Sequence, residues 1–173
     1  MARLTLITGG ARSGKSAHAI ALASAYPGSR RHFLATAEPS DDEMRARIER
    51  HRADRPPAFV TIEEPLALAT ALESLEGRTD VVVLDCLTLW VANLMAQDSD
   101  DSAIIAEAER LVATLTRVSF GAVVVTGEVG AGIVPANPAA RRFRDLLGWT
   151  NQKVARASDR VLLMAAGYPL IVK

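Results

Sequence analysis

Residues 4–16 read Leu-Thr-Leu-Ile-Thr-Gly-Gly-Ala-Arg-Ser-Gly-Lys-Ser, an apolar run followed directly by a glycine-rich loop that ends in Lys15 and Ser16. The spacing from Gly9 to Ser16 is that of a phosphate-binding loop (P-loop) between a strand and a helix. In such a loop the backbone N–H groups turn inward around the phosphates, Lys15 supplies a point charge and Ser16 offers a hydroxyl to Mg²⁺. The positive end of the following helix faces the same anion. The stretch therefore predicts a nucleoside triphosphate site rather than a simple strand-to-helix turn.

Length and composition limit what kind of protein this is. The chain has 173 residues, 49% of them hydrophobic, which is enough for one sizeable core, and we expect a single domain over residues 1–173. Twenty basic and twenty acidic residues give no net charge, so no global field favours nucleic acid or an anionic membrane.

The cysteine content and the apolar runs indicate a cellular compartment. Cys86 is the single cysteine, which excludes an internal disulfide and fits a reducing cytosol. The first residues lack the apolar stretch of a signal peptide, and no apolar run approaches the roughly 20 residues of a membrane helix. We therefore expect a soluble, cytoplasmic protein without a membrane span.

Short apolar runs alternate with longer amphipathic stretches along the chain. This alternation predicts an α/β fold with a mostly parallel sheet flanked by helices. The valine-rich runs at 81–84 and 123–125 are typical of central strands covered on both faces. The last apolar run follows a turn at 166–169, which predicts an antiparallel edge strand. The expected strands are 4–8, 32–36, 81–85, 122–126, 161–165 and 170–172, and the expected helices are 17–25, 42–52, 65–75, 101–118 and 137–158.

The apolar run at 81–84 ends in a carboxylate, Asp85. In a P-loop fold we expect this strand to lie beside the first strand and to direct Asp85 at Mg²⁺. An apolar run followed by Asp also occurs as a simple strand end, so the prediction depends on the P-loop being present. The two motifs together predict Ser16 and Asp85 as the metal-binding pair.

A charged helix is predicted near residues 42–52, opened by acidic residues and closed by arginines and Pro-Pro. Met44, Ile48 and His51 share one of its faces at 3.6 residues per turn, which predicts a half-buried histidine on the inward stripe. Neighbouring guanidinium groups, such as that of Arg47, would favour a neutral, nucleophilic imidazole. Spacing alone nevertheless favours a structural histidine over a catalytic one.

Two later features could bind a ligand. The glycine-rich loop at 126–135 follows a predicted strand, where ligands gather in open α/β sheets, although an ordinary crossover is an equally good interpretation. Arg141, Arg142 and Arg144 begin the next helix and could reach phosphates, although such a cluster is more often a solvated face.

Together these motifs closely resemble the bifunctional adenosylcobinamide kinase/adenosylcobinamide-phosphate guanylyltransferase family of cobalamin biosynthesis. The resemblance runs nearly from end to end, and its central and later motifs are specific to that family. It implies a P-loop NTPase fold and a homotrimer. The segments that carry it are 8–16, 35–37, 41–44, 47–48, His51, 55–56, Glu63, 85–86, 128–130, 132–135, 142–145, Gly148 and 151–152.

The resemblance implies two reactions. ATP or GTP phosphorylates a hydroxyl of adenosylcobinamide, and GTP then guanylylates adenosylcobinamide phosphate through a guanylyl-histidine intermediate. His51 aligns with the nucleophile, Lys15 is the second catalytic residue, and Mg²⁺ is held by Ser16 and Asp85. The nucleotide site implied by the family comprises Gly9, Gly10, Ala11, Arg12, Ser13, Gly14, Lys15, Ser16, Ala35, Thr36, Ala37, Arg52, Ala53, Asp54, Arg55, Glu63 and Asp85.

Some observations bear on the alternatives. Gly127 stands where the family usually has Asn, so a side-chain amide contact is lost there. A P-loop kinase without guanylyl transfer remains an alternative that labelling of His51 would test. A nucleotide-switch protein is disfavoured because the chain has no Asn-Lys-x-Asp motif and no Gly three residues after Asp85. Few aromatic residues are present to stack on bases, which argues against a nucleic-acid partner.

Overall fold

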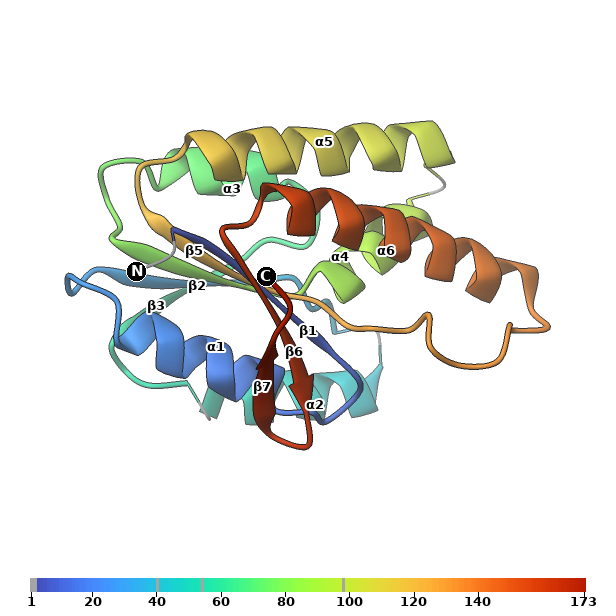
Figure 1. The fold of residues 1–173 in the computed structure, drawn as a ribbon, viewed down its shortest axis with the longest axis horizontal. Helices are drawn as coiled ribbons and strands as arrows, with labels where there is room; N and C mark the ends of the chain where they lie inside the picture. Colours follow the sequence, from blue (N-terminus) through green and yellow to red (C-terminus); the bar gives the residue numbers. More distant parts are fainter. Residues whose placement is uncertain (1–2, 40, 54, 98) are drawn as a thin grey trace.

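Seven strands form one sheet between two layers of helices in the computed structural model (Figure 1), which describes residues 3–39, 41–53, 55–97 and 99–173. The strands are β1 (Leu4–Gly9), β2 (Arg31–Ala35), β3 (Phe59–Glu63), β4 (Val81–Asp85), β5 (Gly121–Val125), β6 (Arg160–Ala165) and β7 (Tyr168–Ile171). The helices are α1 (Lys15–Ser24), α2 (Asp42–Ala53), α3 (Leu68–Ser74), α4 (Leu87–Ala96), α5 (Asp101–Arg117) and α6 (Pro138–Ala157).

The strand order across the sheet is β3-β2-β4-β5-β1-β6-β7. All neighbours pair in parallel except β6 and β7, so the predicted parallel sheet with an antiparallel C-terminal edge is confirmed. The expectation that the Asp85 strand lies beside the first strand is wrong, because β5 separates β4 from β1. Every residue of β5 is buried, and its small apolar side chains suit this central position.

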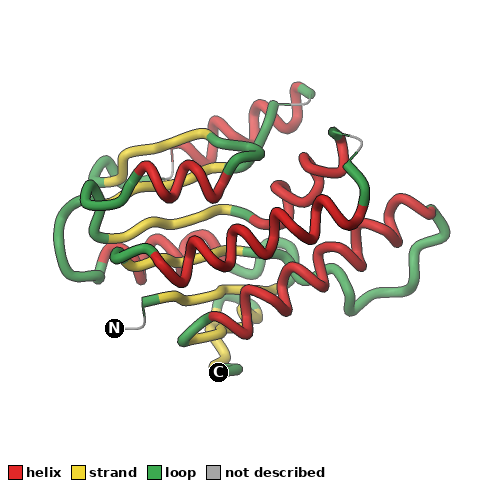
Figure 2. Tube along the Cα trace, turned by 90° about the horizontal axis from the view of Figure 1, so that it is seen from above, coloured by secondary structure: helices red, strands yellow, loops and turns green. Residues whose placement is uncertain are grey.

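Alternate residues along the central strands face two separate cores. Leu6, Val82 and Val124 pack in the core beneath α3, α4, α5 and α6, whereas Ile7 and Val83 belong to the core on the α1 side. Figure 1 shows α1 and α2 on one face of the sheet and the other four helices on the opposite face. Seen from above, α5 and α6 lie side by side over the strands (Figure 2). Burial of both faces explains why the strand sequences are continuously apolar.

Two elements were absent from the sequence-based prediction. Strand β3 is an edge strand with one buried residue, Phe59, so its alternation is too weak to stand out. Helix α4 follows β4 so closely that its apolar sequence reads as a continuation of that strand. Its buried residues nevertheless recur at helical spacing, and that periodicity is the signal that identifies it: Leu87, Trp90, Val91 and Leu94.

In the described part of the chain, no helix combines the length and apolar character needed to span a membrane.

Candidate nucleotide and group-transfer site

The P-loop joins β1 to α1 in a backbone conformation that requires glycine at two positions. Gly9 has φ 150° and Gly14 has φ 92°, values that side chains rarely allow. A Cβ atom on Gly9 would lie 2.6 Å from the carbonyl oxygen of Met164 in β6. The Gly167 N–H in the β6–β7 turn donates to the Ser13 carbonyl at 3.1 Å. The C-terminal hairpin therefore supports the loop from its outer side.

Lys15 and Ser16 occupy the first turn of α1, where the loop ends. The Lys15 Nζ donates to the carbonyl oxygen of Gly10 at 2.5 Å, so the ammonium lies over its own loop. No acidic residue occupies this first turn, which leaves the positive end of the helix dipole facing the loop. The segment has the arrangement that the sequence predicts for a phosphate cradle.

Asp85 at the end of β4 is the point on which four predicted site residues converge. Burial raises the pKa of its carboxyl group, and hydrogen bonding from the Ser16 hydroxyl opposes that shift. Nearby His51, Arg55 and Lys15 also lower this pKa, so all three side chains lie close to the carboxylate. The structure thus brings together groups from α1, α2, β4 and the segment after α2.

His51 lies on the last turn of α2 and its side chain is exposed. The prediction of a half-buried histidine on an inward stripe is therefore wrong, although Met44 and Ile48 on the same face are half-buried. Helical periodicity places side chains on one face, but it cannot say how far neighbouring elements cover that face. None of the α2 side chains that the structure describes is fully buried. The imidazole is consequently accessible to a phosphate.

Two arginines after His51 connect α2 and the following segment to β2 and β3. Arg52 forms an ion pair with Glu63 at the end of β3. The Arg55 guanidinium stacks 4.0 Å from the centre of the Phe33 ring and donates to Thr61 Oγ1 at 3.2 Å. Burial lowers the pKa of Arg55, whereas the negative charge of nearby Asp85 raises it. Phe33 was not predicted as a site residue, because a buried aromatic residue in a strand is typical of any core.

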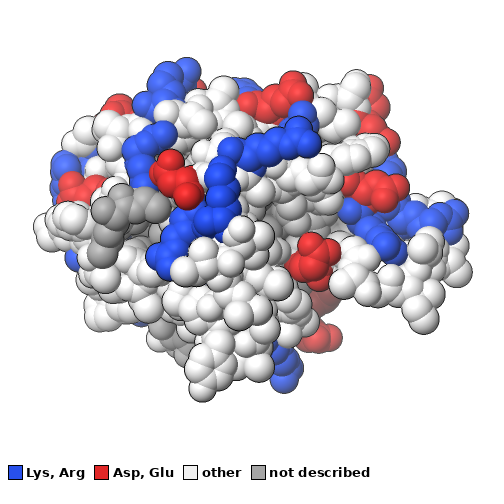
Figure 3. All heavy atoms as spheres, viewed as in Figure 1, with Lys and Arg blue, Asp and Glu red and all other residues white. Residues whose placement is uncertain are grey.

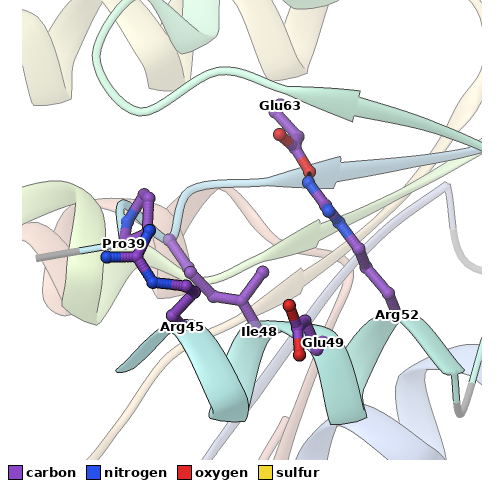
Figure 4. Close-up of a pocket in the computed structure, with 7 residues that line it drawn as sticks. Pro39, Arg45, Ile48, Glu49, Arg52 and Glu63 are labelled. Atoms are coloured by element: carbon purple, nitrogen blue, oxygen red, sulfur yellow. Dashed lines mark hydrogen bonds and ion pairs between the residues drawn. The ribbon is translucent and has the colours of Figure 1, made fainter. Parts of the chain in front are cut away.

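A pocket of about 220 Å³ opens between α2 and the carboxyl ends of β2 and β3. Figure 4 shows Arg52 reaching from α2 to Glu63 on one side, while Arg45 extends toward Pro39 on the other. Its lining includes three residues of the predicted nucleotide site. The complete lining is Ala37, Pro39, Arg45, Ile48, Glu49, Arg52 and Glu63.

Thr36, one of the predicted nucleotide-site residues, is completely buried. Its hydroxyl accepts the Cys86 N–H at 2.8 Å and donates to the Cys86 carbonyl at 2.8 Å, which joins the ends of β2 and β4. Asn93 of α4 donates to the Thr36 carbonyl at 2.8 Å. Asn93 is a positioning residue that the sequence prediction missed, and its signal is a polar side chain within an otherwise apolar helix.

The connection between β5 and α6, orange in Figure 1, is held by side chains from two helices. Thr88 Oγ1 accepts the Gly127 N–H at 2.6 Å, and a Cβ atom on Gly127 would lie 2.9 Å from that oxygen. Arg144 donates to the Gly130 carbonyl at 2.7 Å, and Arg141 binds the carbonyls of Pro135 and Ala136.

Arg142, the third arginine of this cluster, pairs with Asp101 on α5, with Nε 2.6 Å from Oδ1. The three predicted arginines are therefore neither a freely solvated face nor a phosphate clamp in this structure, because each one has a partner within the protein.

Comparison with known proteins identifies the family. A family model described as cobinamide kinase / cobinamide phosphate guanyltransferase matches residues 5–172. The chain belongs to this family. It is 42% identical to the bifunctional adenosylcobalamin biosynthesis protein CobP of Pseudomonas aeruginosa, over 97% of this chain and 96% of that protein. It is 40% identical to CobU of Escherichia coli K12, over 98% of this chain and 99% of the relative.

Solved structures of low sequence identity support the P-loop fold. The RadB recombinase has a TM-score of 0.52 and 18% identity, covering 92% of this chain and 73% of its own. An ATPase of a type III secretion system has a TM-score of 0.58 and 13% identity, and the match covers 94% of this chain and 51% of the ATPase chain. At such identities the likeness shows the fold alone.

This cobinamide kinase/guanyltransferase is thus a bifunctional enzyme of adenosylcobalamin biosynthesis that binds nucleotide through its P-loop. The described residues of the enzyme contain no group of three or more His, Cys, Asp or Glu that could hold a metal ion. Ser16 and Asp85, the predicted metal-binding pair, lie together and offer one hydroxyl and one carboxylate, a donor set that would fit Mg²⁺ held also by phosphates and water.

The face of the molecule drawn in Figure 3 shows no extended field of one sign. Basic and acidic side chains are interspersed over the face drawn in Figure 3, in keeping with the zero net charge.

Two residues named in the sequence analysis have no described position: Asp54 and the side chain of Arg47 lie outside the described part of the structure.

Proposed function

We propose that one nucleotide site serves both reactions of this enzyme. ATP or GTP first phosphorylates the hydroxyl of adenosylcobinamide, and GTP then transfers GMP to adenosylcobinamide phosphate, giving adenosylcobinamide-GDP. The observation that carries the proposal is the convergence of Lys15, Ser16 and His51 on Asp85. A P-loop and an accessible histidine beside one carboxylate allow the same triphosphate to be attacked at either its γ- or its α-phosphorus.

In the kinase reaction the P-loop backbone and Lys15 hold the triphosphate and stabilise the charge on the transferred group. Ser16 and Asp85 would hold Mg²⁺, which neutralises charge on the phosphate oxygens. Lys15 currently binds the Gly10 carbonyl and needs only to exchange that acceptor for a phosphate oxygen.

In the guanylyl reaction an imidazole nitrogen of His51 attacks the α-phosphorus, the bond to the bridging oxygen breaks, and pyrophosphate leaves. An oxygen of adenosylcobinamide phosphate then attacks the same phosphorus, and the bond to the histidine nitrogen breaks. Exposure of His51 supports this role, because its ring can reach both partners. Arg52 follows His51 directly, and Arg55, four residues after His51, lies near both Arg52 and Asp85, so positive charge is supplied at this end of α2.

The pocket beside Ala37 is the proposed place of the guanine base. A carboxylate accepts the N1–H and N2–H groups of guanine, whereas the adenine edge presents no such donor pair. Glu63 supplies a carboxylate in this pocket, and its ion pair with Arg52 orients it. The residues around the pocket thus favour GTP for the guanylyl step, and either nucleotide is proposed for the kinase step.

We also propose a cytoplasmic homotrimer that does not bind nucleic acid. The neutral net charge and the single cysteine support the absence of a nucleic-acid partner and the compartment. Exposed apolar side chains on the edge strand β7 and just after it, at Tyr168, Leu170, Ile171 and Val172, support self-association. Sedimentation equilibrium should give three times the chain mass, and a monomer at all concentrations would contradict the trimer.

Labelling with GTP tests the guanylyl step directly. GTP labelled at the α-phosphate should leave label on the protein that is acid-labile and base-stable, as expected of a phosphoramidate. His51→Ala should abolish this label, and His18→Ala, which changes a histidine on α1, should retain it. Full labelling of the His51→Ala variant would remove His51 from the mechanism.

A further inference from the structure

The segment after β5 enters the middle of the nucleotide site because of the strand order. Val125, the last residue of β5, lies opposite Ile7 of β1 on one side and opposite Asp85 of β4 on the other. β1 continues into the P-loop, and β4 ends at the predicted metal ligand. Glu128, three residues after Val125, therefore follows the only strand that lies between these two parts of the site.

Glu128 is held at this edge by its own backbone and by its neighbours. Its N–H donates to the carbonyl of Gly9, the first P-loop residue, at 3.0 Å. Its Oε1 accepts the Gly130 N–H at 2.6 Å, and the Gly130 carbonyl accepts from Arg144 at 2.7 Å. The side chain is exposed, and Oε2 accepts no hydrogen bond from the part of the chain that the structure describes. One carboxylate oxygen is thus fixed, while the side chain remains exposed to solvent.

The other strand-end carboxylates have different partners. Asp85 accepts hydrogen bonding from Ser16 and faces the cations that surround the triphosphate site. Glu63 is paired with Arg52, and Glu64 accepts the backbone N–H groups of residues 66 and 67. Of these carboxylates, Glu128 is the one beside the P-loop whose second oxygen is available to a substrate hydroxyl.

We propose that Glu128 binds the acceptor hydroxyl in the kinase reaction and takes its proton. This inference rests on the proposed function. The hydroxyl proton moves to Glu128 Oε2 while the hydroxyl oxygen forms a bond to the γ-phosphorus. The bond between that phosphorus and the β–γ bridging oxygen breaks, and the nucleoside diphosphate leaves. The proton then passes from Glu128 to water. A positioned carboxylate accepts a substrate hydroxyl proton in this way in other kinase reactions.

Glu128→Gln separates this role from nucleotide binding. The amide oxygen can still accept the Gly130 N–H, but the side chain can no longer take a proton. With ATP and adenosylcobinamide, we expect kcat to fall by about 100-fold or more, the usual range for loss of a general base, with an unchanged KM for ATP. The decline of the wild-type rate at low pH should be absent from the variant. Labelling of His51 by GTP needs no acceptor and should remain within about twofold of wild type.

Glu107→Gln, which changes a half-buried carboxylate on α5 paired with Arg110, provides the matched control and should keep both activities. A kinase rate within about threefold of wild type in Glu128→Gln would overturn the inference. Loss of His51 labelling together with kinase activity would also overturn it, because the residue would then act on the nucleotide. Absence of kinase turnover in the wild-type enzyme would instead contradict the proposed function itself.

Discussion

The Ser16 hydroxyl on α1 hydrogen bonds to the Asp85 carboxylate at the end of β4, even though β5 separates β4 from the P-loop strand. This hydrogen bond joins the two parts of the predicted Mg²⁺ site directly. The strand inserted between them leads into Glu128, whose N–H donates to the Gly9 carbonyl in the P-loop.

Asp85→Asn should separate activity from stability. Burial raises the pKa of Asp85, because the folded protein disfavours the charged carboxylate. The ionised carboxylate therefore lowers the stability of the fold once the pH rises above the pKa that Asp85 has in the unfolded chain. The neutral amide can still accept from Ser16, but it is a poorer ligand for Mg²⁺. We expect kinase turnover to fall by about 100-fold while Tm at pH 7.5 stays equal or rises. Melting curves and turnover with Mg²⁺ check this, and a Tm loss of several degrees would contradict it.

Arg55→Lys should weaken guanylylation without abolishing it. Lysine keeps the positive charge near Asp85, but it loses the planar stacking on Phe33 and the fork that reaches Thr61. Stacking of this kind contributes about 0.5–2 kcal/mol, which corresponds to a roughly 2- to 30-fold loss. The initial rate of GTP labelling measures the effect. Arg110→Lys on α5 is the control, and an equal loss there would point to a general effect of lysine.

Acid should selectively remove the contribution of Asp80 to stability. The Arg30 side chain, and then the Arg30 and Ser29 backbone N–H groups, lower the pKa of Asp80 to about 2 from a model-peptide value of 3.8. The stabilisation is therefore fully present above pH 3.8 and is lost as the pH falls toward 2. Asp80→Asn should lower Tm at pH 7, and the difference from wild type should shrink over that interval. A Tm difference between wild type and Asp80→Asn that stays constant down to pH 2 would show that ionised Asp80 is not the source of this stability.

The Cys86 thiol should resist alkylation in the native enzyme. Burial and the adjacent Asp85 charge raise its pKa to about 11, so almost no thiolate exists at pH 8. Iodoacetamide should modify the native protein at least about tenfold more slowly than the protein in denaturant, as read by intact mass. Equal rates in the two states would show that the thiol is accessible and ionised.

Elements with a strong local pattern were predicted correctly. The strands of valine runs and the long helix beginning at Pro138 match the structure to within one or two residues. The two elements that were not predicted, β3 and α4, lacked an unambiguous local signal. Only one residue of β3 is buried, and the apolar sequence of α4 continues that of β4. Tertiary contacts with the sheet define both of them.

Site residues divide in the same way. Lys15, Ser16 and Asp85 were predicted from spacing, and His51 from its family motif. The support that holds them was not predicted: the Phe33 ring under Arg55, the Thr36 link to Cys86 and the Asn93 side chain. These contacts join residues more than 20 positions apart, and no local pattern encodes such pairs.

The sequence by itself determined the P-loop, because its glycines, lysine and serine act through backbone conformation and short-range geometry within eight consecutive residues. Only the tertiary structure decided what surrounds that loop. The strand order inserts β5 between β1 and β4, which brings Glu128 beside Gly9, and the sparse cover of α2 leaves His51 exposed. Strand order and helix cover arise from long-range packing, and that packing decides which groups can reach a phosphate held by the loop.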